Sequence, residues 1–157
     1  MRDKGRAVRR LMFIALLLLM SSCALPRIIV LDDPLSPEEH INLGVAYEEK
    51  GELDNAYKEY REASRKLPAA FLYMGNISFK KGEFRDAEVC YKKAIKKDPK
   101  SADAYNNLAW LYYMEKRNLD EAETLATKAI ELNPSKKDIY QDTLDRIRKY
   151  KQDLSKS

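Results

Sequence analysis

The stretch that decides the fold is residues 43–68, LGVAYEEKGELDNAYKEYREASRKLP, because the chain repeats its pattern directly afterwards. Residues 74–99 read MGNISFKKGEFRDAEVCYKKAIKKDP. Six positions recur at a spacing of 31 residues: Gly44 and Gly75, Gly51 and Gly82, Ala56 and Ala87, Tyr60 and Tyr91, Ala63 and Ala94, Pro68 and Pro99. Self-similarity with a period of roughly 20 to 50 residues indicates a stack of repeated units.

A third copy follows at a slightly longer spacing. Gly75 corresponds to Ala109, 34 residues later, whereas Ala94 corresponds to Ala129, 35 residues later. We therefore predict one inserted residue in the turn between Lys116 and Ala122.

Each copy predicts a pair of helices. Residues 36–39, SPEE, supply an N-cap serine, a proline in the first turn and a glutamate that completes a capping box. Ser101 and Ser135 occupy equivalent positions at later helix starts, and Gly51 and Gly82 separate the paired helices. Small residues are expected where the two helices of a pair approach each other: Gly44, Gly75 and Ala109 on the first helix, and Ala56, Ala87 and Ala122 on the second.

The three copies resemble tetratricopeptide repeats. The residues that carry the resemblance are Leu43, Gly44, Tyr47, Gly51, Ala56, Tyr60, Ala63, Pro68 and their equivalents. The resemblance implies an all-α fold, a short solenoid of three helix-turn-helix repeats. Ser78 and Ala126 depart from the pattern, because each replaces an aromatic residue of the family. Residues 138–154 predict one more amphipathic helix, which we expect to cap the solenoid.

The N-terminus has the pattern of an export signal. Five basic residues precede the apolar run Leu11–Met20, which is about 15 Å long as a helix and too short to cross a bilayer. Ser21, Ser22 and Cys23 follow, as small residues do at a signal cleavage site. Without residues 1–22 the chain has equal numbers of acidic and basic residues, which argues against a nucleic-acid partner.

Residues 20–23, MSSC, resemble the lipobox of bacterial lipoproteins, with methionine where the family usually has leucine. The resemblance implies acylation of Cys23, including palmitate-type chains, and cleavage before it. Cleavage in the manner of an ordinary signal peptide and an uncleaved anchor are the alternatives. Ala24 after the cysteine implies an outer-membrane lipoprotein facing the periplasm if the organism is Gram-negative.

The predicted organisation has four parts: signal peptide 1–22, lipidated tether 23–36, repeats 37–134 (37–67, 68–101 and 102–136 approximately), and capping helix with tail 135–157. Extended, the tether reaches at most about 40 Å, so we expect the repeats to lie close to the membrane.

In this family the first helices of the repeats line a groove that takes a peptide or helix of a partner. The resemblance implies that the partner-binding residues are Ile41, Val45, Glu48, Leu72, Asn76, Phe79, Asn106, Trp110 and Tyr113. Trp110, the only tryptophan, is the expected anchor. Packing within the stack is the alternative, with Leu72 evenly balanced between the two interpretations.

Some members of the family grip a terminal carboxylate with a clamp of Lys, Asn and Arg. The matching positions hold no Lys or Arg in this chain, so no clamp is expected: Ile41, Val45, Tyr73, Asp103 and Asn107.

Five lysines of the second repeat form the main charged feature: Lys92, Lys93, Lys96, Lys97 and Lys100. A solvated convex face explains such a run on an exposed helix. Contact with anionic lipid head groups is the alternative, which the short tether permits.

No catalytic constellation, metal site or cofactor motif is evident, so we expect no enzyme, no metal and no cofactor. His40 is the only histidine and stands at a packing position, and Cys90 is expected to be a buried, inert thiol. The sequence predicts a membrane-anchored scaffold or assembly factor of the bacterial cell envelope, with an envelope protein or peptide segment as its partner. A homo-oligomeric structural module stays open as an alternative, and so does a soluble exported adaptor without acylation of Cys23.

Overall fold

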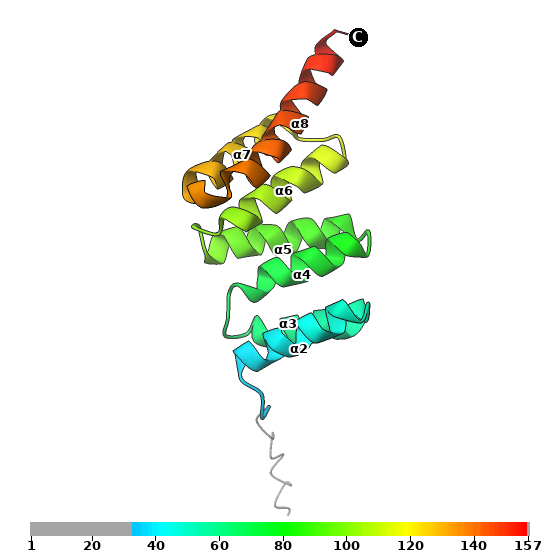
Figure 1. Ribbon diagram of the computed structural model, residues 1–157. Coiled ribbons are helices and arrows are strands. Elements are labelled where there is room, and N and C mark those ends of the chain that lie inside the picture. The colour runs from blue at the N-terminus through cyan, green and yellow to red at the C-terminus, as the bar shows by residue number, and fades with distance from the viewer. Residues whose placement is uncertain (1–32, 157) are drawn as a thin grey trace, which may run out of the picture. The chain divides into compact units, whose positions relative to one another are not determined.

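The computed structural model describes residues 33–156, which form a stack of helices (Figure 1). The helices are α2 (Pro37–Glu49), α3 (Leu53–Ala63), α4 (Ala70–Lys80), α5 (Phe84–Lys97), α6 (Ala102–Met114), α7 (Leu119–Leu132), the 3-10 turn η1 (Pro134–Lys136) and α8 (Lys137–Ser155). Residues 33–156 contain no strand. The predicted signal peptide 1–22 and Cys23 lie outside the described residues.

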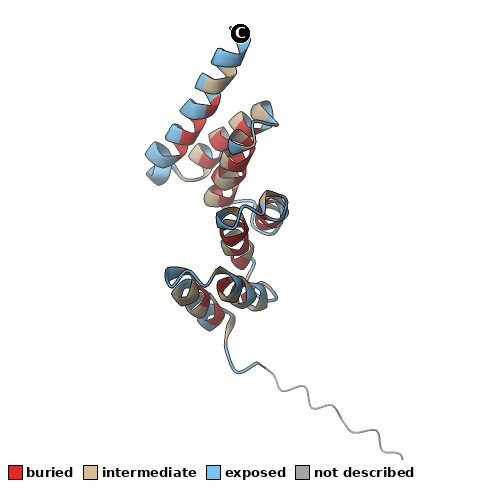
Figure 2. Ribbon diagram, turned by 90° about the vertical axis from the view of Figure 1, so that its right-hand side faces the viewer, coloured by how far each residue is buried: buried red, intermediate tan, exposed pale blue. Residues whose placement is uncertain are grey.

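Three helical pairs and a final helix build the stack in chain order. Each first helix packs against the second helix of its own repeat, and each second helix packs against the first helix of the next. In addition, α4 contacts α6 and α6 contacts α8, so the first helices of the second and third repeats and α8 share one side. Buried residues lie where the helices face one another (Figure 2). This architecture confirms the predicted all-α solenoid of three repeats with a capping helix.

The predicted start of the first repeat is present. The backbone N–H of Glu39 donates to Oγ of Ser36 at 3.1 Å, and the backbone N–H of Ser36 donates to the carboxylate of Glu39 at 2.7 Å. Ser101 precedes α6 without a capping hydrogen bond from its side chain. The prediction for Ser135 was wrong, because this residue lies inside η1 and α8 begins two residues later. Its hydroxyl donates to Oδ1 of Asn133 at 2.6 Å.

The turns within the repeats show why glycine occurs in only two of them. Gly51 and Gly82 adopt φ of +76° and +75°, a left-handed conformation that glycine adopts without steric cost. The third turn is one residue longer, as predicted, and contains two non-glycine residues with positive φ, Lys116 and Asn118. The insertion therefore replaces one left-handed glycine by two left-handed residues, a lysine that adopts this conformation at a steric cost and an asparagine that tolerates it.

The close approach within each pair involves a tyrosine ring. Gly44 faces Tyr60 and Gly75 faces Tyr91, and both rings are buried. The predicted alanine counterparts, Ala56, Ala87 and Ala122, are fully buried but are not the atoms closest to the glycines. The spacing of the repeat pattern carries no information on which side chain fills the gap left by a missing Cβ.

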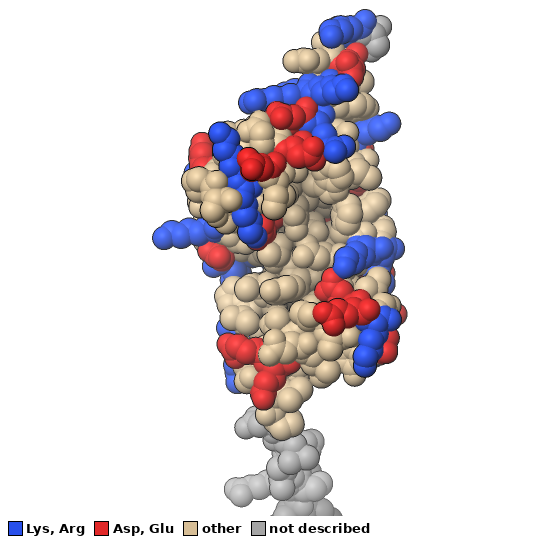
Figure 3. Space-filling model, in the orientation of Figure 1, with Lys and Arg blue, Asp and Glu red and all other residues tan. Residues whose placement is uncertain are grey.

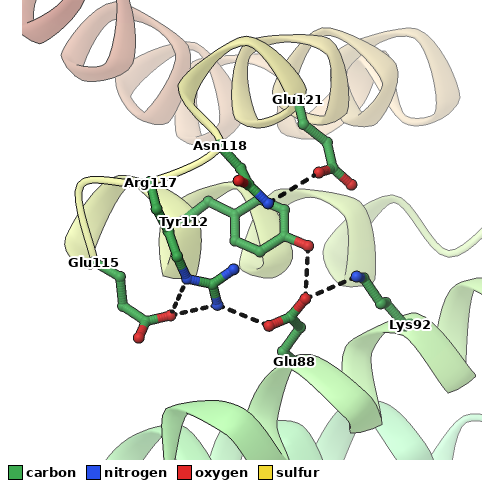
Figure 4. A network of polar contacts seen from close by, with 7 residues as sticks. All are labelled: Glu88, Lys92, Tyr112, Glu115, Arg117, Asn118 and Glu121. Atoms are coloured by element: carbon green, nitrogen blue, oxygen red, sulfur yellow. Dashed lines mark hydrogen bonds and ion pairs between the residues drawn. The ribbon is translucent and has the colours of Figure 1, made fainter.

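A polar network joins the second repeat to the third (Figure 4). Glu88 of α5 accepts hydrogen bonds from Tyr112 at 2.9 Å and Arg117 at 2.7 Å, and pairs with Lys92 at 2.7 Å. The Arg117 guanidinium also lies over the Tyr112 ring, 4.6 Å from its centroid. Partial burial disfavours the charged form of Glu88, but the bonds from Lys92, Arg117 and Tyr112 outweigh it and lower its pKa to about 2.

Candidate partner-binding groove

An open pocket of about 300 Å³ lies on the side formed by the first helices. It is lined by one residue of α2, three of α4, one of α5 and two of α6: Glu48, Asn76, Phe79, Lys80, Tyr91, Asn107 and Trp110. Figure 3 shows this face, on which the centre of the stack is largely uncharged and the charged side chains gather towards the margins and the upper end.

The polar residues of the pocket connect successive repeats. Nζ of Lys80 lies 2.5 Å from Oε1 of Glu48, and the hydroxyl of Tyr60 donates to Oε2 of the same carboxylate at 2.8 Å. Burial and the hydrogen bond to Glu48 raise the pKa of Tyr60, so its hydroxyl remains protonated. The Glu48 carboxylate is thereby held by Tyr60 of its own repeat and by Lys80 of the next repeat.

The middle of the pocket has an amide contact instead of an ion pair. Oδ1 of Asn76 accepts hydrogen bonds from the Tyr91 hydroxyl at 3.1 Å and from Nδ2 of Asn107 at 2.9 Å. With Oδ1 of Asn76 occupied, the two N–H groups of Asn76, the second N–H of Asn107 and Oδ1 of Asn107 are still available. Donors beside an acceptor can bond to both the C=O and the N–H of a peptide group.

The third repeat contributes aromatic rings that extend towards α8. The rings of Trp110 and Tyr113 are 5.2 Å apart, and Tyr113 meets Tyr150 of α8 edge-on at 6.1 Å. The Arg146 guanidinium lies 5.9 Å from the Trp110 ring centroid. A second open pocket of about 380 Å³ occurs here, lined by Tyr113, Arg146, Lys149, Tyr150 and Asp153.

The structure brings together some of the predicted groove residues. Glu48, Asn76, Phe79 and Trp110 line the first pocket, and Tyr113 lines the second.

The other four predicted residues line neither pocket: Ile41, Val45, Leu72 and Asn106. Ile41 and Leu72 are partly buried against the core, whereas Val45 is 37% exposed. Asn106 is 8% exposed, and its Oδ1 is buried without a hydrogen-bond partner. Its neighbour Asn107 faces the pocket instead, because adjacent residues of a helix point about 100° apart.

Sequence reasoning missed the contribution of α8. A signal was present, since the 35-residue spacing that relates Ala94 to Ala129 also relates Tyr105 to Tyr140 and Tyr112 to Ile147. By this spacing α8 corresponds to the first helix of a further repeat. Its contact with α6 agrees with that position.

Two of the residues matched to the family's carboxylate clamp make contacts within the stack. Tyr73 stacks on Tyr60, and Asp103 accepts from Tyr140 at 2.8 Å and pairs with Lys136 at 2.9 Å. Lys80, which the mapping did not include, brings a cation to the pocket, where Glu48 already pairs with it.

The histidine of the chain lies outside the pockets and is engaged in packing. His40 is buried, with Nδ1 2.7 Å from Oε2 of Glu59. Residues 33–156 hold no cluster of three or more His, Cys, Asp or Glu side chains arranged for a metal ion. No helix in the same part of the chain is both long and apolar enough to cross a membrane.

Family profiles match all three repeats. The profile described as TPR repeat matches residues 75–116, and the one described as Tetratricopeptide repeat matches residues 40–65 and 102–136.

Two curated proteins are similar over part of the chain. Protein O-mannosyl-transferase TMTC2 of Homo sapiens is 34% identical over 101 residues, which is 60% of this chain and 12% of that protein. Stress-induced-phosphoprotein 1 of Caenorhabditis elegans is 39% identical over 59 residues, which is 38% of this chain and 18% of that protein. The chain therefore spans less than a fifth of either relative.

Solved structures share the fold. The TPR2B domain of yeast Sti1, in its pHsp70 complex, has a TM-score of 0.68 at 22% identity, over 73% of this chain and 97% of that one. The first TPR of Spaghetti (RPAP3), bound to an HSP90 peptide, has a TM-score of 0.67 at 19% identity, over 75% and 94% of the two chains. With three matched repeats and this shared architecture, the helical stack of this chain is a tetratricopeptide-repeat domain.

Proposed function

We propose that this protein is a lipid-anchored interaction module of the bacterial cell envelope, which holds a segment of a partner protein in the groove between α2, α4, α6 and α8. The observation that carries the proposal is the pocket between Glu48, Asn76 and Trp110, where polar and aromatic groups of three repeats converge. Tetratricopeptide domains are typically protein-interaction modules without catalytic activity, and the similar solved domains include ones in complex with peptides.

The chemistry of the pocket suits an extended polypeptide. The contacts of Asn76 and Asn107 leave N–H donors and the acceptor Oδ1 of Asn107 for a peptide group, while Phe79 and Trp110 offer apolar surface in the same pocket. Partly exposed aromatic residues are favoured anchors at interfaces, because they bury a large area with few rotatable bonds. We therefore expect a partner segment whose backbone bonds to the amides and whose apolar side chains contact the rings.

The proposed lipid anchor is supported by the sequence of the predicted signal peptide and Cys23. Residues 1–10 are basic, Leu11–Met20 is apolar, and Cys23 follows two serines. Two or more acyl chains give stable attachment, whereas one chain binds a bilayer only marginally. Cys90 is buried, which leaves Cys23 as the cysteine available for acylation.

The groove is tested by photo-crosslinking in the native cell. A probe replaces Trp110 in one strain, and the control probe replaces Glu121 on α7, a second helix of a repeat. Recovery of one defined envelope protein from position 110 and not from position 121 supports the groove as the binding surface. Recovery from position 121 alone, or of this protein only, contradicts it.

The anchor is tested by metabolic labelling with a fatty-acid analogue. The native chain is expected to incorporate label and to stay with membranes at high salt, and Cys23→Ser is expected to lose both properties. Cys90→Ser serves as the control, since it should keep the label. Equal labelling of Cys23→Ser and the native chain would contradict the lipoprotein assignment.

A further inference from the structure

We infer that the second helices of the first two repeats dock on an anionic membrane surface, so that the groove faces away from the membrane. The docking surface, here called the basic face, consists of Arg61, Arg65, Lys66, Lys92, Lys96 and Lys97. The orientation of the domain on the membrane rests on the proposed lipid anchor. The docking surface itself rests on the charges of α3 and α5.

The basic residues of α3 and α5 occupy the same repeat positions. With the 31-residue spacing, Arg61, Arg65 and Lys66 correspond to Lys92, Lys96 and Lys97. All six residues are exposed. The coincidence of charge at three equivalent positions makes the basic face a feature of two repeats, which the lysine run of the second repeat alone did not show.

The third repeat breaks this pattern. The residues of α7 that correspond to Lys92, Lys96 and Lys97, at a spacing of 35, are Thr127, Glu131 and Leu132. A general requirement for solubility would apply to α7 equally, so solubility does not explain the difference. At these three positions the first two repeats therefore carry only cations, and the third repeat carries none.

Much of the charge on the basic face is not neutralised. Lys66, Lys96 and Lys97 form no ion pair with any residue in the described range 33–156. Arg61 and Arg65 share the single carboxylate of Glu62, at 3.8 and 3.0 Å. Lysine and arginine near an anionic bilayer each contribute to binding through its negative surface potential, which extends about one Debye length.

The helices α3 and α5 pack on a common core. Tyr57 of α3 and Cys90 of α5 belong to one hydrophobic cluster, to which Ile77 of the intervening α4 also contributes. Lys93 of α5 also lies 5.7 Å from the ring centroid of Phe71, in the helix between them.

The position of the tether agrees with this orientation. About a dozen residues separate Cys23 from α2, a reach of at most about 40 Å. With Cys23 acylated, the first repeat could lie no further than this from the bilayer, and α3 and α5 are the first two second helices in chain order. The pocket of Asn76 and Trp110 is lined mainly by α2, α4 and α6, with Tyr91 as the one residue of α5, so docking of the basic face leaves it open to a partner.

The test uses the full-length acylated chain in vesicles of phosphatidylcholine alone or mixed with phosphatidylglycerol. Lysines are modified with an amine-reactive reagent and quantified by mass spectrometry. We expect Lys96 and Lys97 to be protected several-fold in the anionic vesicles, and the protection to disappear at high salt. Lys128 of α7, which corresponds to Lys93, should react equally in both vesicle types.

Matched variants separate the basic face from the anchor. Each lysine near an anionic surface is worth about five-fold in binding, so Lys96→Glu with Lys97→Glu, which also adds two negative charges, should weaken docking by more than about 25-fold. Lys128→Glu should leave it unchanged. A Cys23→Ser chain that still co-sediments with anionic but not neutral vesicles supports the basic face even if acylation fails.

Two results would overturn the inference. One is equal reactivity of Lys96 and Lys97 in the two vesicle types while the chain co-sediments with both. The other is protection of the same lysines by duplex DNA at equal phosphate concentration and not by anionic vesicles, which would assign the basic face to nucleic acid.

Discussion

Gly75 lies against the ring of Tyr91 so closely that a Cβ atom on Gly75 would stand 2.5 Å from Cδ1 of that ring. The first repeat has the same relationship between Gly44 and Tyr60. In the third repeat the equivalent residues are Ala109 and Ala126, so the Cβ appears where the ring is missing. The glycine and the tyrosine thus pack as a pair. Where the third repeat has Ala126 in place of the tyrosine, it also has Ala109 in place of the glycine.

Gly75→Ala should therefore destabilise the protein by about 2 kcal/mol, although alanine is the better helix former. In a Tyr91→Ala background the same substitution should no longer destabilise, because the clash is gone. Urea denaturation of the four chains measures the coupling. Equal losses in both backgrounds would show that the ring is not the cause.

The ion pairs of Glu88 predict a specific pH dependence. Its pKa is about 2 in the folded protein, against an ordinary value of 4.5, so the charged form is favoured by folding. The stabilisation is complete above about pH 4.5 and is lost as the pH falls towards 2. Glu88→Gln should cost roughly 1 kcal/mol at neutral pH, after allowance for solvent screening, and nothing below pH 2.

Denaturant titrations at several pH values measure this difference. Glu131→Gln is the control, since Glu131 pairs with Lys128 at an exposed site and should contribute little at any pH. A difference between the native chain and Glu88→Gln that does not change between pH 5 and pH 2 would refute the assignment.

Trp110→Ala should weaken partner binding at least about tenfold, since a central aromatic anchor carries much of the energy of an interface. The measurement is the yield of partner crosslinked to a probe at Phe79, in the same pocket. Met114→Ala is the control, because Met114 is 49% exposed and lines neither pocket. Trp110→Ala should also destabilise the fold less than Tyr112→Ala, whose ring is fully buried.

Cys90 should react with maleimide only when the domain unfolds. Burial raises the pKa of its thiol, and the hydrogen bond from Tyr57 only partly opposes this effect. The reactivity of Cys90 as a function of urea should follow the unfolding transition measured by circular dichroism. Rapid labelling in the absence of denaturant would mean that α3 and α5 separate in the native state.

The fold was predictable because its determinants recur in the chain. Gly51 and Gly82 mark two turns, Ser36 and Glu39 mark the first helix, and the change of spacing locates the longer third turn. Ser135 misled the prediction, since a serine before a helix also suits a 3-10 turn when an asparagine can bond to it.

The groove was less predictable, because it depends on helix rotation and on contacts between repeats. One residue separates Asn106 from Asn107, yet the first is buried and the second lines the pocket. Lys80 lines the pocket and bonds to Glu48, 32 residues away, a contact that no periodic pattern specifies. Arg146 and Tyr150 line the second pocket because α8 packs as a further first helix, a role that its amphipathic pattern alone did not reveal.

The contacts that join successive first helices, and the one that joins α6 to the turn η1 before α8, differ in kind, and so should their response to salt. Glu48 and Lys80 form a half-exposed ion pair at one end, and Asp103 with Lys136 forms another at the far end. Between them Asn76 and Asn107 form a neutral bond that salt does not screen. We therefore expect added salt to weaken the contacts at the two ends of the stack, while the bond at the midpoint of the groove keeps its strength.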